Sequence, residues 1–84
     1  MHTYALKPNA FKELNKLSKD TQKRIIRKLD YFTQSDNPLV FAEALINFEL
    51  GSYRYRVGDY RIIFDLKNDV IVILSIGHRR DIYK

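Results

Sequence analysis

Apolar residues that recur every three or four positions follow a short strand near the start of the chain. The strand is predicted at His2–Leu6, and Lys7-Pro8 ends it. Asn9 can then cap a helix, whose apolar positions are Ala10, Phe11, Leu14 and Leu17. We therefore expect a strand followed directly by a short helix.

A longer helix is predicted next, with Asp20 as its N-cap. Its apolar stripe consists of Ile25, Ile26, Leu29 and Phe32. Basic residues lie largely off this stripe and are interpreted as a solvated face; they are Lys23, Arg24, Arg27 and Lys28. The helix is expected to stop at the polar run from Ser35 to Pro38.

The segment Leu39–Leu50 follows no single period. It allows a helical turn through Phe41 and Ala44 or an extended stretch through Phe48. Neither alternative is favoured by the sequence.

After Gly51 the pattern becomes clear again. Three runs rich in Tyr, Val, Ile and Phe are separated by Gly58-Asp59 and by Lys67-Asn68-Asp69, which predicts a three-stranded antiparallel meander. The order of elements therefore predicts an α+β fold in a single domain over residues 1–84. It consists of an N-terminal strand, two helices, and then the meander packed on the helices.

Alternation along the meander assigns one apolar face to the helices. It comprises Tyr53, Tyr55, Val57, Tyr60, Ile62, Phe64 and Leu66, and then Val70, Val72, Leu74 and Ile76. Arginines fall on the opposite, open face. A two-residue turn at Gly58-Asp59 pairs Arg56 with Arg61, and a three-residue second turn would set Arg61 across from Ser75. With Gly77 and Arg79 further along, we expect a basic hollow floored by small residues.

Two arginines side by side on a sheet need an explanation, because like charges directly opposite destabilise a strand pair by about 0.2–1 kcal/mol. A bound anion would relieve this, and so would pairing with Glu49, Asp59 or Asp81. Asp65 is a poor partner for Arg61, since four strand residues separate them by roughly 13 Å. Several arginines around small residues favour a phosphate site.

Net charge, cysteine content and the length of the apolar stretches limit the possible partners and location of the protein. Lys and Arg number 15 against 10 Asp and Glu, a net charge of +5, which favours a polyanion or an acidic protein as partner. Cysteine is absent, which excludes disulfides and thiolate metal sites and fits a cytoplasmic protein. The longest apolar stretch, Val70–Leu74, is too short to cross a membrane. We expect a cytoplasmic protein with no membrane partner.

Two segments carry a family resemblance. Residues 53–64 read Y-R-Y-R-V-G-D-Y-R-I-I-F and residues 76–83 read I-G-H-R-R-D-I-Y. Together they are similar to the RelE branch of the RelE/ParE toxin superfamily. The resemblance implies a RelE-like fold, a RelB-like antitoxin as partner, and metal-independent cleavage of messenger RNA on the ribosome, with no cofactor. In such enzymes the 2′-hydroxyl attacks the adjacent phosphate, giving a 2′,3′-cyclic phosphate and a 5′-hydroxyl.

The resemblance also implies roles for single residues. Arg61 would stabilise the phosphorane, Arg79 would assist the leaving 5′-oxygen, and Tyr83 would be a base or a stacking group. His78 is a further candidate, because histidine is the side chain best suited to proton transfer near neutral pH, although the predicted register points it inward. RNA-binding residues would be Arg54, Arg56, Arg80 and Lys84, with the Lys23–Lys28 cluster solvated or facing the ribosome.

Other functions stay open at this point. Lysines that many RelE-type enzymes carry are replaced here by Ile46-Asn47 and Gly51-Ser52, which leaves ribosome dependence undecided. The alternatives are a ParE-like, non-enzymatic inhibitor of DNA gyrase and an inactive homologue that only binds an antitoxin or RNA.

Overall fold

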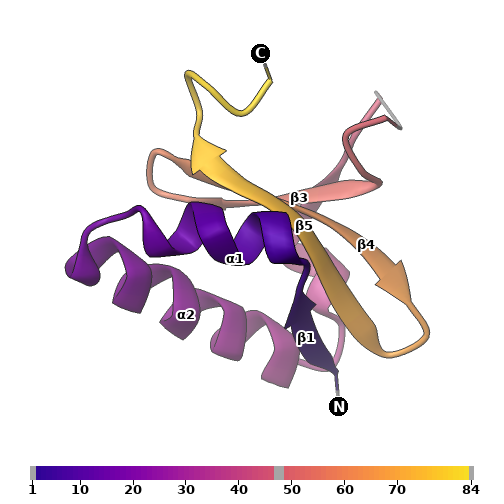
Figure 1. Ribbon diagram of the computed structural model, residues 1–84. Coiled ribbons are helices and arrows are strands. Elements are labelled where there is room, and N and C mark those ends of the chain that lie inside the picture. The colour runs from indigo at the N-terminus through magenta and orange to yellow at the C-terminus, as the bar shows by residue number, and fades with distance from the viewer. Residues whose placement is uncertain (1, 47–48, 84) are drawn as a thin grey trace.

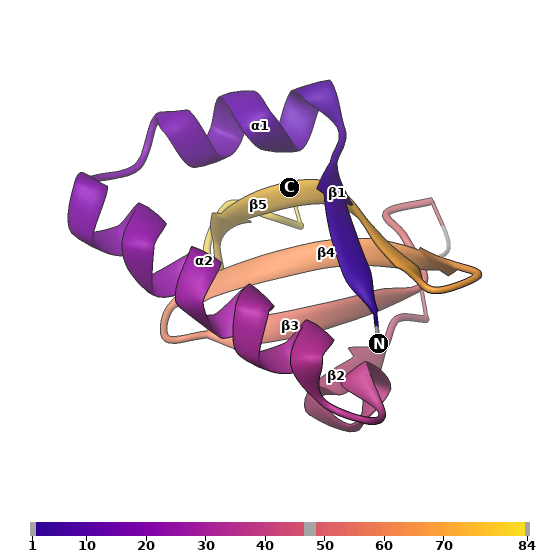
Figure 2. The same ribbon diagram turned by 90° about the horizontal axis from the view of Figure 1, so that it is seen from below.

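The computed structural model describes residues 2–46 and 49–83. One sheet is covered on one face by two helices (Figures 1 and 2). The elements are β1 (Thr3–Leu6), α1 (Pro8–Asn15), α2 (Lys19–Gln34), the 3-10 helix η1 (Pro38–Phe41), β2 (Ala42–Ala44), β3 (Tyr53–Val57), β4 (Tyr60–Lys67) and β5 (Val70–His78). The predicted order of strand, helices and meander is confirmed.

The sheet is larger than the meander alone. Its strand order is β1-β5-β4-β3-β2, with β1 parallel to β5 and every other neighbouring pair antiparallel. Among the described residues, neither α-helix is long and apolar enough to cross a membrane.

Both predicted helix N-caps, Asn9 and Asp20, are wrong by two residues. Lys7 precedes α1 without a side-chain cap, and Pro8 opens the helix, where its missing N–H costs nothing. Ser18, not Asp20, caps α2, because its Oγ accepts a hydrogen bond from the Thr21 N–H at 3.2 Å. Asp20 lies in the first turn, where its charge favours the helix dipole. The predicted stop is confirmed, with Ser35 as the C-cap.

Asn9 does not cap α1; its side chain and that of Glu13 hydrogen-bond to β5 beyond the end of β1, where β5 has no neighbouring strand on that side among the described residues. Asn9 Nδ2 donates to Leu74 O at 3.4 Å, and Glu13 Oε1 accepts from the backbone N of Ile76 at 3.1 Å and from Ser75 Oγ at 3.1 Å. Side chains thereby replace a strand, because a buried N–H without a partner is costly.

The ambiguous segment contains both kinds of structure. A turn of 3-10 helix over Pro38–Phe41 leads into the three-residue edge strand β2, which pairs with β3. The extended alternative through Phe48 lies outside the described residues.

The register of β5 differs from the prediction. Asn68 adopts a positive φ of 54°, which allows a two-residue turn that pairs Lys67 with Val70. The pairing then shifts between Ile63 and Phe64, where β5 contributes one extra residue. Arg61 therefore lies across from Gly77 and not from Ser75.

This shift also changes which residues of β5 are buried. Ile71 and Ile73 are fully buried in the core, whereas Val70, Val72 and Leu74, which were expected there, are only half-buried. The bulge restores the predicted parity further on, so Ile76 is buried as expected. The remaining core residues come from both helices and the central strands, and include Ala10, Leu14, Ile25, Leu29, Phe32, Tyr55, Val57, Ile62 and Phe64.

Candidate functional site

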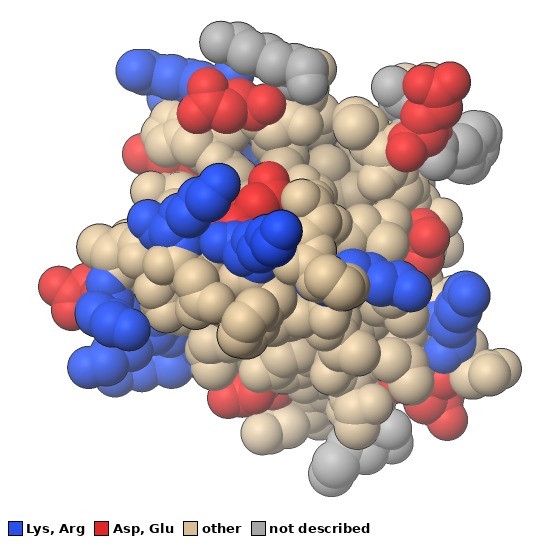
Figure 3. All heavy atoms as spheres, viewed as in Figure 1, with Lys and Arg blue, Asp and Glu red and all other residues tan. Residues whose placement is uncertain are grey.

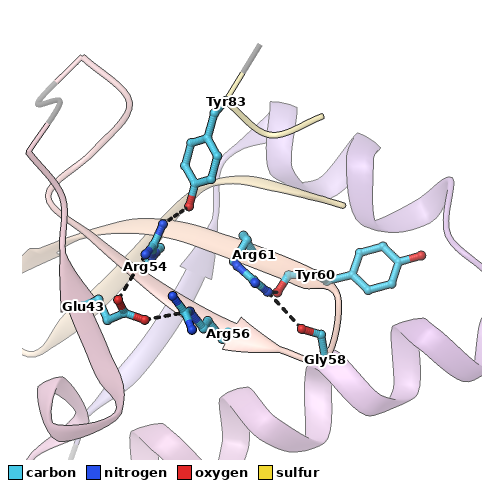
Figure 4. Close-up of polar contacts among 7 residues, drawn as sticks. All are labelled: Glu43, Arg54, Arg56, Gly58, Tyr60, Arg61 and Tyr83. Atoms are coloured by element: carbon cyan, nitrogen blue, oxygen red, sulfur yellow. Dashed lines mark hydrogen bonds and ion pairs between the residues drawn. The ribbon is translucent and has the colours of Figure 1, made fainter. Parts of the chain in front are cut away.

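Three arginines of β3 and β4 lie on the sheet face opposite the helices, which we call the arginine face: Arg54, Arg56 and Arg61 (Figure 4). The two-residue turn pairs Arg56 with Arg61, as predicted. The turn is local and its Gly58 takes a φ of 59°, which glycine adopts without strain.

A carboxylate that the sequence did not reveal lies among these arginines. Glu43 of β2 accepts from Arg54 Nη2 at 3.1 Å and from Arg56 Nε at 2.7 Å (Figure 4). The hydrogen bond from Arg54, with the charges of Arg54, Arg56 and Arg61, lowers the pKa of Glu43 below its usual value. Glu43 is therefore ionised at neutral pH. Glu43 could have been located from its cross-strand pairing with Arg54, but this pairing requires β2, and a strand of three residues is too short to be predicted from the sequence.

Arg54 connects Glu43 to the C-terminal segment. Its Nη1 donates to the Tyr83 hydroxyl, its guanidinium lies 5.7 Å from the centre of the Tyr83 ring, and its Nε is buried without a hydrogen-bond partner in the described structure. Only 22 % of the Arg54 side chain is exposed, against 57 % for Arg56. Arg54 thus holds Glu43 and Tyr83, and Arg56 is more accessible to a ligand.

The segment after β5 folds back over the sheet. The backbone N–H groups of Asp81 and Ile82 donate to His78 O at 2.9 and 3.0 Å. Ile82 packs on Gly77 so closely that a Cβ there would lie 3.1 Å from Ile82 Cδ1. The expected hollow floored by small residues is therefore wrong in part, because Ile82 covers Gly77 and Ser75 is bonded to Glu13.

Arg61 and Arg79 both bind the β3–β4 turn, Gly58 and Asp59. Arg61 Nη1 donates to Gly58 O at 2.9 Å and to Tyr60 O at 3.0 Å, so two carbonyl oxygens fix the guanidinium without neutralising it. Arg79 donates its backbone N–H to Asp59 O at 2.7 Å, and its Nε lies 3.7 Å from Asp59 Oδ1. The structure thus brings the two predicted catalytic arginines to one turn.

Other predicted site residues lie elsewhere. His78 pairs with Tyr60 across the strands, and the two rings meet edge to face at 5.6 Å. Tyr60 points away from Arg61 in Figure 4, so His78 lies on the side away from the arginines, as its register predicted. Its Nδ1 accepts from the backbone N–H of Arg80, an exposed residue. Lys84 lies outside the described residues.

A second basic surface covers the outside of α2. Figure 3 shows Lys and Arg side chains over α1 and the first turns of α2, with acidic side chains between them. Two open hollows of about 370 and 380 Å³ lie along α2. They are lined by Lys19, Gln22, Lys23, Ile26 and Arg27, and by Arg24, Arg27, Lys28 and Tyr31. Neither hollow is lined by the arginines of the sheet.

Residues 2–46 and 49–83 contain no group of three or more His, Asp or Glu side chains arranged to hold a metal ion. The groups that the described residues bring together around Arg54 are fixed cations, the ionised carboxylate of Glu43 and the phenol of Tyr83.

Comparison with known proteins identifies relatives of the chain. A family model described as ParE toxin of type II toxin–antitoxin system, parDE, matches residues 4–83. No curated protein matches the chain.

Solved structures share its fold. The toxin–antitoxin complex RelBE2 from Mycobacterium tuberculosis contains a chain that is 24 % identical, with 93 % of this chain and 98 % of that chain covered and a TM-score of 0.78. In the RelB–RelE complex from Methanococcus jannaschii the identity is 24 %, the coverage 93 % of each chain and the TM-score 0.72. For the RelE–RelB complex from Pyrococcus horikoshii the identity is 27 %, the coverage 95 % of this chain and 96 % of that chain, and the TM-score 0.69.

Proposed function

The chain belongs to the ParE toxin family of the RelE/ParE superfamily, the toxins of type II toxin–antitoxin systems, and we propose that it is a metal-independent endoribonuclease that cleaves messenger RNA on the ribosome. The observation that carries this proposal is the position of Arg61. Two backbone carbonyls hold its charged guanidinium beside Arg56 on the arginine face. Preorganised cations of this kind stabilise charge that develops on a phosphate in the transition state.

The reaction that fits this face is an internal transfer at phosphorus. The 2′-oxygen of a ribose bonds to the adjacent phosphorus, the bond to the 5′-oxygen breaks, and a 2′,3′-cyclic phosphate and a 5′-hydroxyl result. Arg56 and Arg61 bind the non-bridging oxygens. Glu43 accepts the proton of the 2′-hydroxyl, and Arg79 assists the leaving 5′-oxygen, which takes its proton from water.

The protonation states on this face favour a slow intrinsic reaction. The lowered pKa of Glu43 makes it a weak base, and an arginine side chain, which stays protonated at neutral pH, is a poor acid. Tyr83, held by Arg54, is available to stack on a base. Arg80 and Lys84 are proposed to contact the RNA backbone. The ribosome would then contribute by orienting the message.

An antitoxin is the proposed partner. Similar chains occur in solved complexes of RelE with RelB. We assign this chain a RelB-like antitoxin as its inhibitor for the same reason.

Primer extension on a defined message in a reconstituted translation system tests the proposal. Wild-type protein, Arg61→Ala and Lys67→Ala are compared, with ribosome-free RNA alongside. Lys67 is the matched control, because it carries the same charge at the far end of β4. We expect ribosome-dependent cuts for wild type and Lys67→Ala, and a loss of about 100-fold or more for Arg61→Ala. Absence of cuts with the wild-type protein would refute the proposal.

A second function is favoured by the family model itself, which describes ParE toxins. A ParE-like protein would inhibit DNA gyrase by contact, without cleaving RNA. Gyrase supercoiling assays with the same three proteins distinguish the two functions. Inhibition that survives Arg61→Ala, together with uncut message, would establish the gyrase inhibitor. Failure of both assays, with antitoxin binding intact, would indicate an inactive homologue.

A further inference from the structure

The Arg24 side chain of α2 lies beside Gly58 in the β3–β4 turn. A Cβ built on Gly58 would lie 2.8 Å from Arg24 Nη2, 3.4 Å from Arg24 Cζ and 3.8 Å from Arg24 Nη1. Outside the two residues that flank Gly58, these are the three heavy atoms nearest to that position, and all belong to one guanidinium. The guanidinium of Arg24 therefore occupies the space that any side chain at position 58 would take.

This contact joins two layers of the molecule. Arg24 belongs to α2, which covers one face of the sheet (Figure 2), and Gly58 directly follows β3. A guanidinium is planar and weakly hydrated, so it packs on a flat peptide group in a way that a lysine ammonium cannot. The absence of a side chain at Gly58 makes this close approach available.

The same turn holds the two arginines of the proposed reaction. Gly58 O accepts from Arg61 at 2.9 Å, and Asp59 accepts from Arg79 through its backbone oxygen at 2.7 Å. A displacement of the turn would carry both guanidiniums with it. Since a misplacement of about 1 Å can cost up to 100-fold in rate, the position of the turn matters for catalysis.

We propose that Arg24 is a positioning residue, which packs on Gly58 from α2 and thereby sets the placement of Arg61 and Arg79. This inference rests on the proposed endonuclease function for its consequence in rate, but not for the placement itself. Arg24 acts through the turn and does not touch the RNA in this scheme.

Arg27 provides the matched control. It lies one turn further along the same face of α2 and carries the same charge, but none of the three atoms nearest to a Cβ at position 58 belongs to it. Arg24→Ala and Arg27→Ala therefore remove equal charge from one helix, but only the first removes the contact with the turn. Arg24→Lys keeps the charge and removes the planar group.

The experiment compares these three variants with the wild-type protein by kinetics and by NMR. We expect Arg24→Ala and Arg24→Lys to lower kcat for ribosome-bound message about tenfold with KM unchanged, and Arg27→Ala to leave kcat unchanged. We also expect the Arg61 Nε–Hε resonance and the Gly58 amide resonance to shift in both Arg24 variants but not in Arg27→Ala. Circular dichroism verifies that each variant is folded.

Gly58→Ala adds a second, independent test. Its Cβ would compete with the Arg24 guanidinium for one space, so adding Arg24→Ala to Gly58→Ala is expected to cause little further change in kcat or in the Arg61 resonance. Equal behaviour of Arg24→Ala and Arg27→Ala, or an unmoved Arg61 resonance, overturns the inference. If the wild-type protein cuts no message, the proposed function fails, and the NMR comparison still decides the role of Arg24.

Discussion

Replacing Tyr55 by phenylalanine removes one hydroxyl from the centre of the core and tests how the arginine face is held. The Tyr55 side chain is fully buried, and its hydroxyl donates to Pro38 O at 2.9 Å. The ring packs on Phe32 and Phe64, each with 4.4 Å between ring centres. Phenylalanine retains this packing. The change therefore isolates the hydrogen bond that ties β3 to the start of η1.

The expected loss of stability follows from the carbonyl oxygen that the substitution leaves unpaired. Without the hydroxyl, Pro38 O loses its partner in a buried position, which costs about 1–3 kcal/mol. A domain of this size loses roughly 4–8 °C in Tm for each kcal/mol. Because η1 leads directly into β2, which carries Glu43, we expect the loss to loosen the edge of the arginine face as well.

Alkaline pH provides a second measure of the same group. Burial raises the pKa of Tyr55 from 10.0 to about 12. The neutral form is favoured in the folded state, so its contribution is complete below pH 10 and is lost as the pH rises from 10 to 12. A rise in the pKa of Tyr55 from 10.0 to about 12 corresponds to about 3 kcal/mol in the free energy of unfolding. Tyr55→Phe lacks this contribution, so its stability relative to wild type should recover over the same interval.

Urea unfolding followed by circular dichroism at pH 7 and between pH 10 and 12 measures both effects. Tyr53→Phe is the control, since Tyr53 is half-buried on the same strand face. A Tyr55→Phe protein within about 0.5 kcal/mol of wild type at pH 7, with an unchanged alkaline profile, would refute the reasoning.

The other predictions concern two carboxylates. Glu43→Gln removes the negative charge beside the arginines. We expect a lower KM for ribosome-bound message, because the repulsion of phosphate is reduced, and a lower kcat, because the proton acceptor is lost. Steady-state kinetics measure both. Since the pKa of Glu43 is lowered, the stabilising effect of its ion pairs is complete above its ordinary pKa of 4.5 and is lost as the pH falls through the folded value; an NMR titration of its carboxyl carbon should have a midpoint below 4.5. Glu13→Ala leaves the Ile76 N–H without its acceptor and should cost about 1–3 kcal/mol in urea unfolding, whereas Glu13→Gln retains an acceptor oxygen and should cost less.

Each of these predictions has an opposite outcome. A Glu43→Gln protein with unchanged kcat would exclude Glu43 as proton acceptor. A midpoint at or above 4.5 would show that the arginines do not stabilise its charge. Equal losses for the two Glu13 variants would show that the edge of β5 does not depend on that carboxylate oxygen.

Local patterns account for what the sequence predicted well. Alternation in β3 and β4, together with a two-residue turn at Gly58 and Asp59, was enough to place Arg56 beside Arg61. Both features span only neighbouring residues. The inward register of His78 followed from the same alternation.

The predictions were wrong or missing where the local sequence pattern does not distinguish between alternatives. Residues Val70–Leu74 are all apolar, so the sequence contains no alternation that would identify the buried face of β5. The bulge that changes the register cannot be predicted in such a segment, because both faces of the strand carry the same kind of residue. β2 has three residues and pairs with β3, so no pattern within its own sequence places Glu43 beside the arginines.

By itself, the sequence determined the order of elements, the meander and the presence of arginines on one face, because helix and strand periods are properties of adjacent residues. The tertiary structure decided which groups meet those arginines. Glu43 reaches Arg54 from another strand, Ile82 covers Gly77, and Arg24 reaches Gly58 from a helix. These contacts depend on how the layers pack, and no short-range pattern in the chain contains that information.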